Sequence, residues 1–419
     1  MRDKLRSRLE RLRRSGELAP AQPAVSPPED RLREERFLFP GEESQERTAS
    51  GCCYLRQLSF PLEQQHGDYT LGKSLDCYGS DLSLPARDHS LQALDPQRYL
   101  FLDIETTGLS GGTGTWVFMI GLGWLSQGSF NIRQYFLRHP AEERAMLHHF
   151  AAFAAPFDGL VTFNGKAFDL PLIQTRQMLR KTPQTAPREH LDLLICARSL
   201  WRKRFPSRRL SFLEESLLGF QRSDDIPGAE IPGVYFSYLR HGETGRLRKV
   251  FEHNVYDILS MAGLLGRIAF TAASERPAHP AESYALGRLY HEAGHIEKAQ
   301  GYYCQVSGGA LGQAALLQRA LIHKRHGEWA EAATLWQELA GRENNHPEAC
   351  VELAKYYEHR VRDYRTALHW SSRALAGSHR RGGSPYSSPL HPAALQHRIN
   401  RLKTKFEQQK TRPALKNAE

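Results

Sequence analysis

The sequence predicts an α/β domain, built on a mixed five-stranded sheet flanked by helices, followed by an all-α solenoid. Two observations support this fold class. Strand and helix patterns alternate between residue 98 and about residue 270, whereas the chain from about residue 282 has only helical patterns. Alternating patterns are typical of a sheet covered by helices, and a helical stretch with a regular period is typical of stacked helix pairs.

Composition adds two expectations about partners and location. The chain has 419 residues, with 56 Lys and Arg against 46 Asp and Glu, so its net charge of +10 favours a polyanionic partner such as nucleic acid. Its six cysteines show no C-x-x-C pair and no zinc-ligand spacing, the first residues are charged, and no uninterrupted run of about 18 apolar residues occurs. We therefore expect a cytoplasmic protein with no membrane partner.

Residues 1–97 precede the first clear α/β pattern. Residues 1–50 predict a basic, Pro-rich disordered tail, because "MRDKLRSRLERLRR" is strongly basic and "ELAPAQPAVSPPEDR" cannot pack. A solvated arm and an arm that binds nucleic acid both fit this composition. Residues 51–97 form an N-terminal extension with one strand-like piece, "CCYLRQLSFPL", and the sequence assigns it no role.

Residues 98–272 are the predicted α/β domain. The apolar run Tyr99 to Ile104 predicts a strand buried on both faces, and "WVFMIGLGWL" and "SFNIRQYFL" predict two more strands linked by tight turns. A helix, "AEERAMLHHFAAFAA", a short strand, "GLVTFNG", and a second helix with Pro171 in its first turn follow. "HLDLLICARSLW" fits a strand or a strand–helix junction, and "VFEHNVYDILSMAGLL" lies in the last helix.

Residues 282–377 predict helical repeats. Three segments, "HEAGHIEKAQGYYCQ", "HKRHGEWAEAATLWQ" and "EHRVRDYRTALHWSS", share their pattern of small and aromatic residues, and their aligned alanines are Ala299, Ala332 and Ala367. A period of about 34 residues with these offsets is the tetratricopeptide signature. Such solenoids usually bind proteins, so we expect a protein partner for the repeats. Residues 378–419 are expected to form a basic C-terminal tail.

Four carboxylates occur at or near the ends of elements in the α/β domain. Asp103 and Glu105 end the first strand, and residues two apart on a strand point the same way. Asp169 stands at the start of a helix, and Asp257 lies on the inward face of the last helix. Singly, each has a structural explanation: a helix cap for Asp169, an ion pair with an arginine such as Arg267 for Asp257, and an exposed strand end for the first two. Together they predict a site for divalent cations, because Mg²⁺ prefers oxygen ligands.

These acids lie in phrases that resemble a known family. "DIETTG", "FNGKAFDLP" and "HNVYD" resemble, in order, the three motifs of the DEDD 3′–5′ exonucleases of the ribonuclease H-like superfamily. The phrase F-N-G-x-x-F-D-x-P particularly resembles the proofreading exonuclease domain of family B DNA polymerases. With the helical repeats behind it, the whole chain resembles bacterial proteins that join a ribonuclease H-like domain to tetratricopeptide repeats. The resemblance implies a ribonuclease H-like fold and two-metal hydrolysis of single-stranded DNA or RNA.

The resemblance also implies roles for single residues. Two ions, Mg²⁺ or Mn²⁺, would be bound by four acids: Asp103, Glu105, Asp169 and Asp257. Asp103 would bridge the two ions. Asn164 matches the asparagine of the second motif. The third motif departs from the family pattern. The family has either Tyr four residues before the last Asp or His five residues before it, whereas this chain has His253 four residues before Asp257.

His253 is expected to orient or deprotonate the attacking water, and a histidine that caps the edge of the core is the alternative. Asp192, a fifth acid at a strand end, is expected to serve as a capping or hydrogen-bonded residue. The stretch "RSLWRKRFPSRR", residues 198–209, contains six basic residues and no acid. Basic groups neutralise phosphates and aromatic rings stack on bases, although a solvated helix face explains the run as well. The predicted nucleic-acid-binding residues are Asn164, Trp201, Arg202, Lys203, Arg204, Arg208 and Arg209.

Three functions stay open at the level of sequence. The first is a metal-dependent 3′–5′ exonuclease acting on single strands. The second is a non-catalytic or weakly catalytic nucleic-acid-binding scaffold that recruits partners through its repeats, and the altered third motif leaves this open. The third is a structure-specific endonuclease with the same metal site. Retention of all four acids favours catalysis, because uncompensated buried charges are costly.

Overall fold

The computed structural model describes residues 39, 42–48, 51–108, 114–126, 128–341, 346–378 and 390–411. The chain divides into two units, Met1–Glu43 and Ser44–Glu419, and the elements below lie almost wholly in the second. The predicted disordered tail at residues 1–50 and the two ends of the predicted C-terminal tail fall largely outside the described residues. Within the first, Glu43–Thr48 form a strand, so the prediction of disorder is wrong there.

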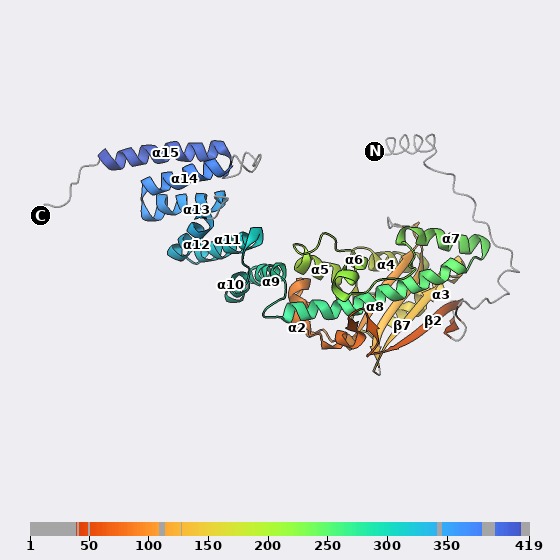
Figure 1. Ribbon diagram of the computed structural model, residues 1–419. Coiled ribbons are helices and arrows are strands. Elements are labelled where there is room, and N and C mark those ends of the chain that lie inside the picture. Colours follow the sequence, from red (N-terminus) through yellow and green to blue (C-terminus); the bar gives the residue numbers. More distant parts are fainter. Residues whose placement is uncertain are drawn as a thin grey trace, which may run out of the picture. The chain divides into compact units, whose positions relative to one another are not determined.

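A mixed seven-stranded sheet forms the centre of the α/β domain (Figure 1). In spatial order its strands are β1 (Glu43–Thr48), β2 (Gly51–Pro61), β7 (Ser129–Phe136), β6 (Val117–Ser126), β5 (Tyr99–Thr106), β8 (Gly159–Thr162) and β9 (Glu189–Asp192). The neighbours β2–β7, β7–β6 and β6–β5 are antiparallel, whereas β8 pairs parallel to β5 and β9 parallel to β8. The α/β class is therefore confirmed, with seven strands instead of the expected five.

The two additional strands come from residues before the predicted domain. "CCYLRQLSFPL" is indeed a strand, and it pairs with β7 from Tyr54 opposite Phe136 to Pro61 opposite Ser129. The rest of the extension consists of a small hairpin and short helices: β3 (Gln65–His66), β4 (Tyr69–Thr70), η2 (Leu71–Asp76), α2 (Gly79–Ala86), η3 (His89–Ala93) and η4 (Pro96–Arg98). Leu71, Leu82 and Leu91 from these elements are buried in the main core. The extension is therefore structurally part of the α/β core.

Helices complete the domain: α3 (Glu143–Ala154), α4 (Asp169–Arg180), α5 (Leu193–Trp201), α6 (Leu210–Leu213), the π-helical turn η6 (Glu214–Leu218), η7 (Gly228–Glu230), α7 (Ile231–His241) and α8 (Gly245–Ala273). The alternative of a strand–helix junction at residues 189–201 is confirmed. Helix α8 crosses the sheet and packs on β5, β6 and β7 (Figure 1). By length and composition α8 is apolar enough to cross a membrane, but 78% of its most apolar window is buried inside the protein, as in a core helix.

Helix α8 lies unusually close to the middle of β6. A Cβ on Gly121 would lie 2.0 Å from the side-chain oxygen of Asn254, and one on Gly123 would lie 2.5 Å from Ile258. Asn254 and Ile258 are both fully buried. Two glycines in an otherwise apolar strand therefore mark the place where a helix contacts the strand backbone.

The C-terminal region is wholly helical, as expected. It contains three successive helix pairs, α9 (Pro280–Glu292) with α10 (Ile296–Cys304), α11 (Gly309–Arg325) with α12 (Trp329–Gly341), and α13 (Pro347–Tyr356) with α14 (Tyr364–Ser378), and then α15 (Pro392–Thr411). The aligned alanines Ala299, Ala332 and Ala367 lie on the second helix of each pair and are fully buried.

Part of the predicted basic tail is a packed helix. Helix α15 packs against α14, and Leu395, Ile399 and Leu402 are buried on one face. These residues occupy positions i, i+4 and i+7, the spacing of an amphipathic helix, so the excess of Lys and Arg concealed an apolar stripe. Beside them Arg398, Arg401 and Lys405 surround the buried carboxylate of Glu358.

Replacing Gly121 by Ala should destabilise the domain, because the added methyl would overlap Asn254. Overpacking of this kind costs about 1–3 kcal/mol, measured as a loss in the free energy of unfolding in denaturant. Gly233→Ala is the matched control, since nothing lies within 4 Å of a Cβ in that exposed turn of α7. The control should be neutral or slightly stabilising. Equal effects of the two substitutions would contradict the close packing of α8 on β6.

Candidate active site and metal cluster

The first two acids lie on the face of β5 that α8 covers. Asp103 and Glu105 are two residues apart on this strand, so their side chains point the same way as the core residues Tyr99 and Phe101. The strand is buried along nearly its whole length, which confirms the prediction of a strand covered on both faces. Glu105 is 9% exposed, and no side-chain hydrogen bond partner is found for it among the described residues.

Helix α8 supplies the residues that face β5. His253 and Asp257 are one turn apart, so they lie on the same side of the helix, and His253 Nε2 is 3.5 Å from Asp257 Oδ2. One donor atom from each of Glu105, His253 and Asp257 lies within 4.8 Å of the others. The structure therefore brings together three of the predicted site residues as a group that could hold a metal ion.

Asp103 is held by a buried amide chain that the sequence did not reveal. Asn254 Nδ2 donates to Asp103 Oδ2 at 2.8 Å, and Gln134 Nε2 donates to Asn254 Oδ1 at 2.9 Å. Arg56 in turn donates to Gln134 at 3.3 Å. This series of hydrogen bonds fixes the orientation of the Asn254 amide, so that its Nδ2 group faces Asp103. The only sign of it in the sequence was Gly121, because no larger residue leaves room for Asn254.

Asp257 is paired with an arginine, but not with Arg267. Arg222 Nη2 donates to Asp257 Oδ1 at 2.5 Å and to Glu214 at 2.8 Å, and Arg222 Nε donates to Glu214 at 2.7 Å. Arg222 Nη1 lies 3.1 Å from Asp225. Arg267 instead donates to the hydroxyl of Tyr69. Arg222, Glu214 and Asp225 belong to a segment with no motif, so sequence patterns had no means of selecting them.

Asp169 is the first residue of α4 and is 6% exposed. Burial raises the pKa of Asp169 to about 7. A hydrogen bond from the residue's own backbone N–H opposes this shift, and the charges of Asp192 and Asp257 add to it. Phe168, not Asp169, occupies the capping position of α4, so the capping explanation for Asp169 does not hold. Its charge helps to raise the pKa values of Asp103 and Glu105, but Asp169 is not in the group formed by Glu105, His253 and Asp257.

Asp192 is a capping residue, as expected. Its carboxylate accepts hydrogen bonds from the backbone N–H groups of Leu194, at the start of α5, and of Asn164 and Lys166. It therefore holds the loop that leads into α4. Asn164 in that loop has a left-handed backbone with φ of 71°, and its side chain is exposed at a cavity described below.

The electrostatics of this cluster favour bound cations. Burial and the charges of Asp257 and Asp169 raise the pKa of Asp103 well above its ordinary range. The hydrogen bond from Asn254 lowers this pKa, but by less. Burial raises the pKa of Glu105 in the same way, with Asp103 as the largest charged contributor. Buried carboxylates without partners need protons or cations. The unpartnered Glu105 and its neighbours fit a divalent ion, and the group that the structure brings together for it is Glu105, His253 and Asp257.

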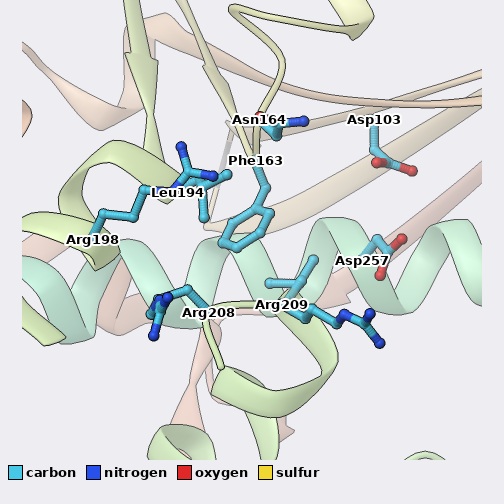
Figure 2. Close-up of a pocket in the computed structure, with 9 residues that line it drawn as sticks. Asp103, Phe163, Asn164, Leu194, Arg198, Arg208, Arg209 and Asp257 are labelled. Carbon is cyan, nitrogen blue, oxygen red and sulfur yellow. The ribbon is translucent and has the colours of Figure 1, made fainter. Parts of the chain in front are cut away.

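A cavity of about 470 Å³ opens beside Asp103 and Asp257. Its other lining residues combine three apolar side chains, one amide and three arginines: Phe163, Leu194, Leu210, Asn164, Arg198, Arg208 and Arg209. Figure 2 shows Phe163 in the middle, with the two acids on one side of it and Arg198 and Arg208 on the other. The guanidinium of Arg209 points towards the side of Asp257 (Figure 2). The cavity thus joins the acids to a basic and apolar surface.

The predicted nucleic-acid-binding stretch, residues 198–209, does not form one surface. Arg208 and Arg209 line the cavity, whereas Arg202 and Lys203 are exposed and are not among its lining residues. Trp201 was expected to stack on bases, and this is wrong. It is fully buried, because its ring packs in the core and its Nε1 donates to Glu282 of α9 at 2.9 Å.

Arg204 pairs with the same Glu282 at 2.6 Å. Its charge therefore joins the turn after α5 to α9. The sequence could not separate these residues, because a run of basic and aromatic residues looks the same whether its members point into the core or out of it.

The match to a protein family agrees with this fold. Residues 100–269 match the family described as "RNase_H superfamily". The chain is 29% identical over 364 residues to "Uncharacterized protein YprB" from Bacillus subtilis (strain 168), covering 84% of this chain and 86% of that protein. A solved family B DNA polymerase from the hyperthermophilic archaeon Pyrobaculum calidifontis aligns over 47% of this chain and 29% of its own, at 18% identity. Its TM-score of 0.32 is too low to establish a shared fold.

The metal-free protein should lose stability as the pH rises from about 4 to about 8. The folded state keeps protons on Asp103, Glu105 and Asp169 that the unfolded state releases near pH 4, so deprotonation in the folded state costs free energy. Mn²⁺ should replace those protons, and it should raise the melting temperature more at about pH 8 than at about pH 6. At a hundredfold excess over Kd the stabilisation is about 2.7 kcal/mol.

Asp103→Asn is the control for this measurement. It removes one repelling charge, and the new amide oxygen can still accept from Asn254, so the metal-free variant should melt above the wild type at about pH 8. Mn²⁺ should stabilise the variant much less. A Mn²⁺ effect that is independent of pH, or that is unchanged in the variant, would argue against these acids as the binding site.

Proposed function

We propose that the protein is a metal-dependent nuclease that hydrolyses single-stranded DNA or RNA as a 3′–5′ exonuclease, and the match of residues 100–269 to the RNase H superfamily supports this. One observation supports this above all. Buried carboxylates that lack sufficient positive charge converge beside a cavity lined by arginines and apolar side chains. Such a pairing of metal ligands with a phosphate-binding surface suits phosphodiester hydrolysis.

In the proposed reaction, water adds its oxygen to the terminal phosphorus and the bond from phosphorus to the 3′ oxygen breaks. The last nucleotide leaves as a 5′-monophosphate, and the 3′ oxygen of the shortened strand takes up a proton. Bound Mg²⁺ or Mn²⁺ would activate the water and offset charge on the leaving oxygen. Asn254 holds Asp103 in place, and Arg222 holds Asp257, so the ligands are positioned before substrate arrives.

The cavity supports a single-stranded substrate. Phe163, Leu194 and Leu210 offer an apolar surface on which a base can rest, and Arg198 and Arg209 are exposed and can contact phosphates. A volume of about 470 Å³ lies within the ordinary range for small-ligand pockets, so one nucleotide at a strand end would occupy much of it.

The C-terminal helices are proposed to be tetratricopeptide repeats that recruit a protein partner. Three helix pairs with buried alanines at matching positions support this identification. Glu282 of α9 accepts from Trp201 and Arg204 of the α/β domain, so the repeats are joined to it by a buried polar contact. Because β1 and β2 pair into the same sheet, we propose that the α/β domain includes residues before 98 and ends at residue 272. We also propose that the repeats span residues 282–377 and that the protein is cytoplasmic.

Purified protein should shorten end-labelled single-stranded DNA or RNA from the 3′ end with Mn²⁺ or Mg²⁺ present, and EDTA should abolish this activity. Asp103→Asn should lower the rate by more than the roughly 100-fold that loss of an outer-shell partner costs, because it removes a proposed ligand. A ladder that starts at internal positions would identify an endonuclease. Tight binding without cleavage by either metal would favour the scaffold function.

Arg209→Gln should raise KM several-fold while leaving kcat nearly unchanged, because Arg209 is proposed to contact phosphate and not the reacting atoms. It should also reduce the slope of log binding constant against log salt concentration by about 0.7. Arg144→Gln, an exposed arginine on α3 that is not among the cavity residues, is the control and should change neither quantity. Equal effects of the two substitutions would point to diffuse charge, not to the cavity.

A further inference from the structure

We propose that His253 is a metal ligand, so that the centre has a mixed nitrogen–oxygen site formed by His253, Glu105 and Asp257. Such a site favours a first-row transition ion such as Mn²⁺ over Mg²⁺. The inference rests on the proposed function for its setting, because it deepens the description of the same metal centre. It replaces the expected role of His253 as the residue that orients or deprotonates water.

The first argument is the position of His253 on α8. His253 and Asp257 are four residues apart, so one turn of helix presents both side chains to the same point. Helical pairs with this spacing are a common way to present two ligands to one ion. Together with Glu105 of β5 they place three donor atoms within 4.8 Å of one another, from two elements that pack directly on each other.

The second argument is the orientation of the imidazole. Both carboxylate oxygens of Asp225 lie 2.9 Å from His253 Nδ1. Asp225 is itself held by the backbone N–H of Ile226 at 2.8 Å and by Arg222 at 3.1 Å. Arg222 Nη1 also lies 3.3 Å from Nδ1, but the Asp225 carboxylate is closer and faces Nδ1 with both oxygens. It therefore places the ring proton on Nδ1 and leaves the lone pair on Nε2, the nitrogen that lies on the side of Asp257. A histidine held in this way by a carboxylate is typical of metal-binding histidines.

The third argument concerns the free oxygen of Asp257. Arg222 uses Nη2 to hold Asp257 Oδ1 at 2.5 Å, and the guanidinium is anchored by two bonds to Glu214, whose side chain is 2% exposed. Ser260 donates to Glu214 at 2.6 Å and fixes it further. Arg222 thus occupies one oxygen and leaves Oδ2, 3.5 Å from His253 Nε2, to bind an ion.

The fourth argument is independent of these hydrogen bonds. Glu105 is nine-tenths buried, contributes a donor atom to the same group, and has no hydrogen bond partner among the described side chains. An ionised carboxylate in such a place needs a cation, and Arg222 is already shared among Glu214, Asp225 and Asp257. The two oxygens and one imidazole nitrogen then form a ligand set that suits transition ions, whereas Mg²⁺ prefers oxygen alone.

The experiment is a calorimetric titration of the metal-free full-length protein with Mn²⁺ and, separately, with Mg²⁺, combined with pulsed electron paramagnetic resonance of the Mn²⁺ complex. His253→Gln replaces the nitrogen by an amide oxygen. We expect it to weaken Mn²⁺ binding by more than the roughly 100-fold that loss of an outer-shell partner costs, and Mg²⁺ binding much less. The wild type should show coupling of the Mn²⁺ electron spin to a ¹⁴N nucleus, and His253→Gln should lack it.

Asp225→Asn tests the orientation of the ring without removing the nitrogen. It should weaken Mn²⁺ binding less than His253→Gln does and should keep the ¹⁴N coupling. Asp224→Asn is its matched control, because the neighbouring carboxylate is largely exposed and pairs with Lys249. His326→Gln, an exposed histidine after α11, is the control for loss of an imidazole. Both controls should leave the Mn²⁺ affinity unchanged, and circular dichroism should show all variants folded.

Absence of ¹⁴N coupling in the wild type, or equal weakening of Mn²⁺ and Mg²⁺ binding by His253→Gln, would overturn the inference. The nuclease assay separates this failure from that of the proposed function. Metal-dependent cleavage without nitrogen coupling would leave the nuclease standing and remove His253 as a ligand. Nitrogen coupling with no cleavage of any single strand would leave the ligand standing and remove the nuclease. Binding of Mg²⁺ without binding of Mn²⁺ would overturn the inference alone, and binding of neither ion would overturn both.

Discussion

Burial of negative charge between β5 and α8 is the constraint on which the rest of the α/β domain depends. Asp103 and Glu105 on the strand face Asp257 on the helix, and burial and the charges of Asp257 and Asp169 raise the pKa values of both strand acids. Folding alone would make this arrangement unfavourable, since like charges in a poorly hydrated place repel strongly. The surrounding structure supplies fixed hydrogen bonds and one arginine, which offset part of the cost and leave the remainder to bound cations.

The parts of the chain that offset this charge come from distant segments. Arg56 of β2 and Gln134 of β7 orient Asn254 towards Asp103. On the other side, His66 of the small hairpin bonds to Ser260 at 2.8 Å, and its ring stacks 3.8 Å from that of Phe220. Ser260 donates a hydrogen bond to Glu214, Glu214 accepts from Arg222, and Arg222 donates to Asp257. The N-terminal extension therefore supports both sides of the centre, which gives a physical reason for its packing into the same core.

Most of the fold was predictable because hydrophobic periodicity is a local property of the chain. The hairpins of β5, β6 and β7, the helix α4 with Pro171 in its first turn, and the helix pairs with buried alanines all follow from short patterns. Strand β2 was identified as a strand, yet its place in the sheet was not, because pairing with β7 joins residues that are about 75 positions apart. The C-terminal segment was expected to be helix-like, but the packing of α15 on α14 was not predicted, because its many basic residues hide an apolar stripe.

For the site, the sequence by itself determined which acids are present and that they fall at element ends, where a shared centre is possible. Only the tertiary structure decided their partners. Arg222 rather than Arg267 pairs with Asp257, Asn254 holds Asp103, and Trp201 lies in the core instead of on the surface. The physical reason is the same in each case. The ionic and hydrogen-bonding environment of a side chain depends on which distant segments the fold brings beside it, and local patterns do not contain that information.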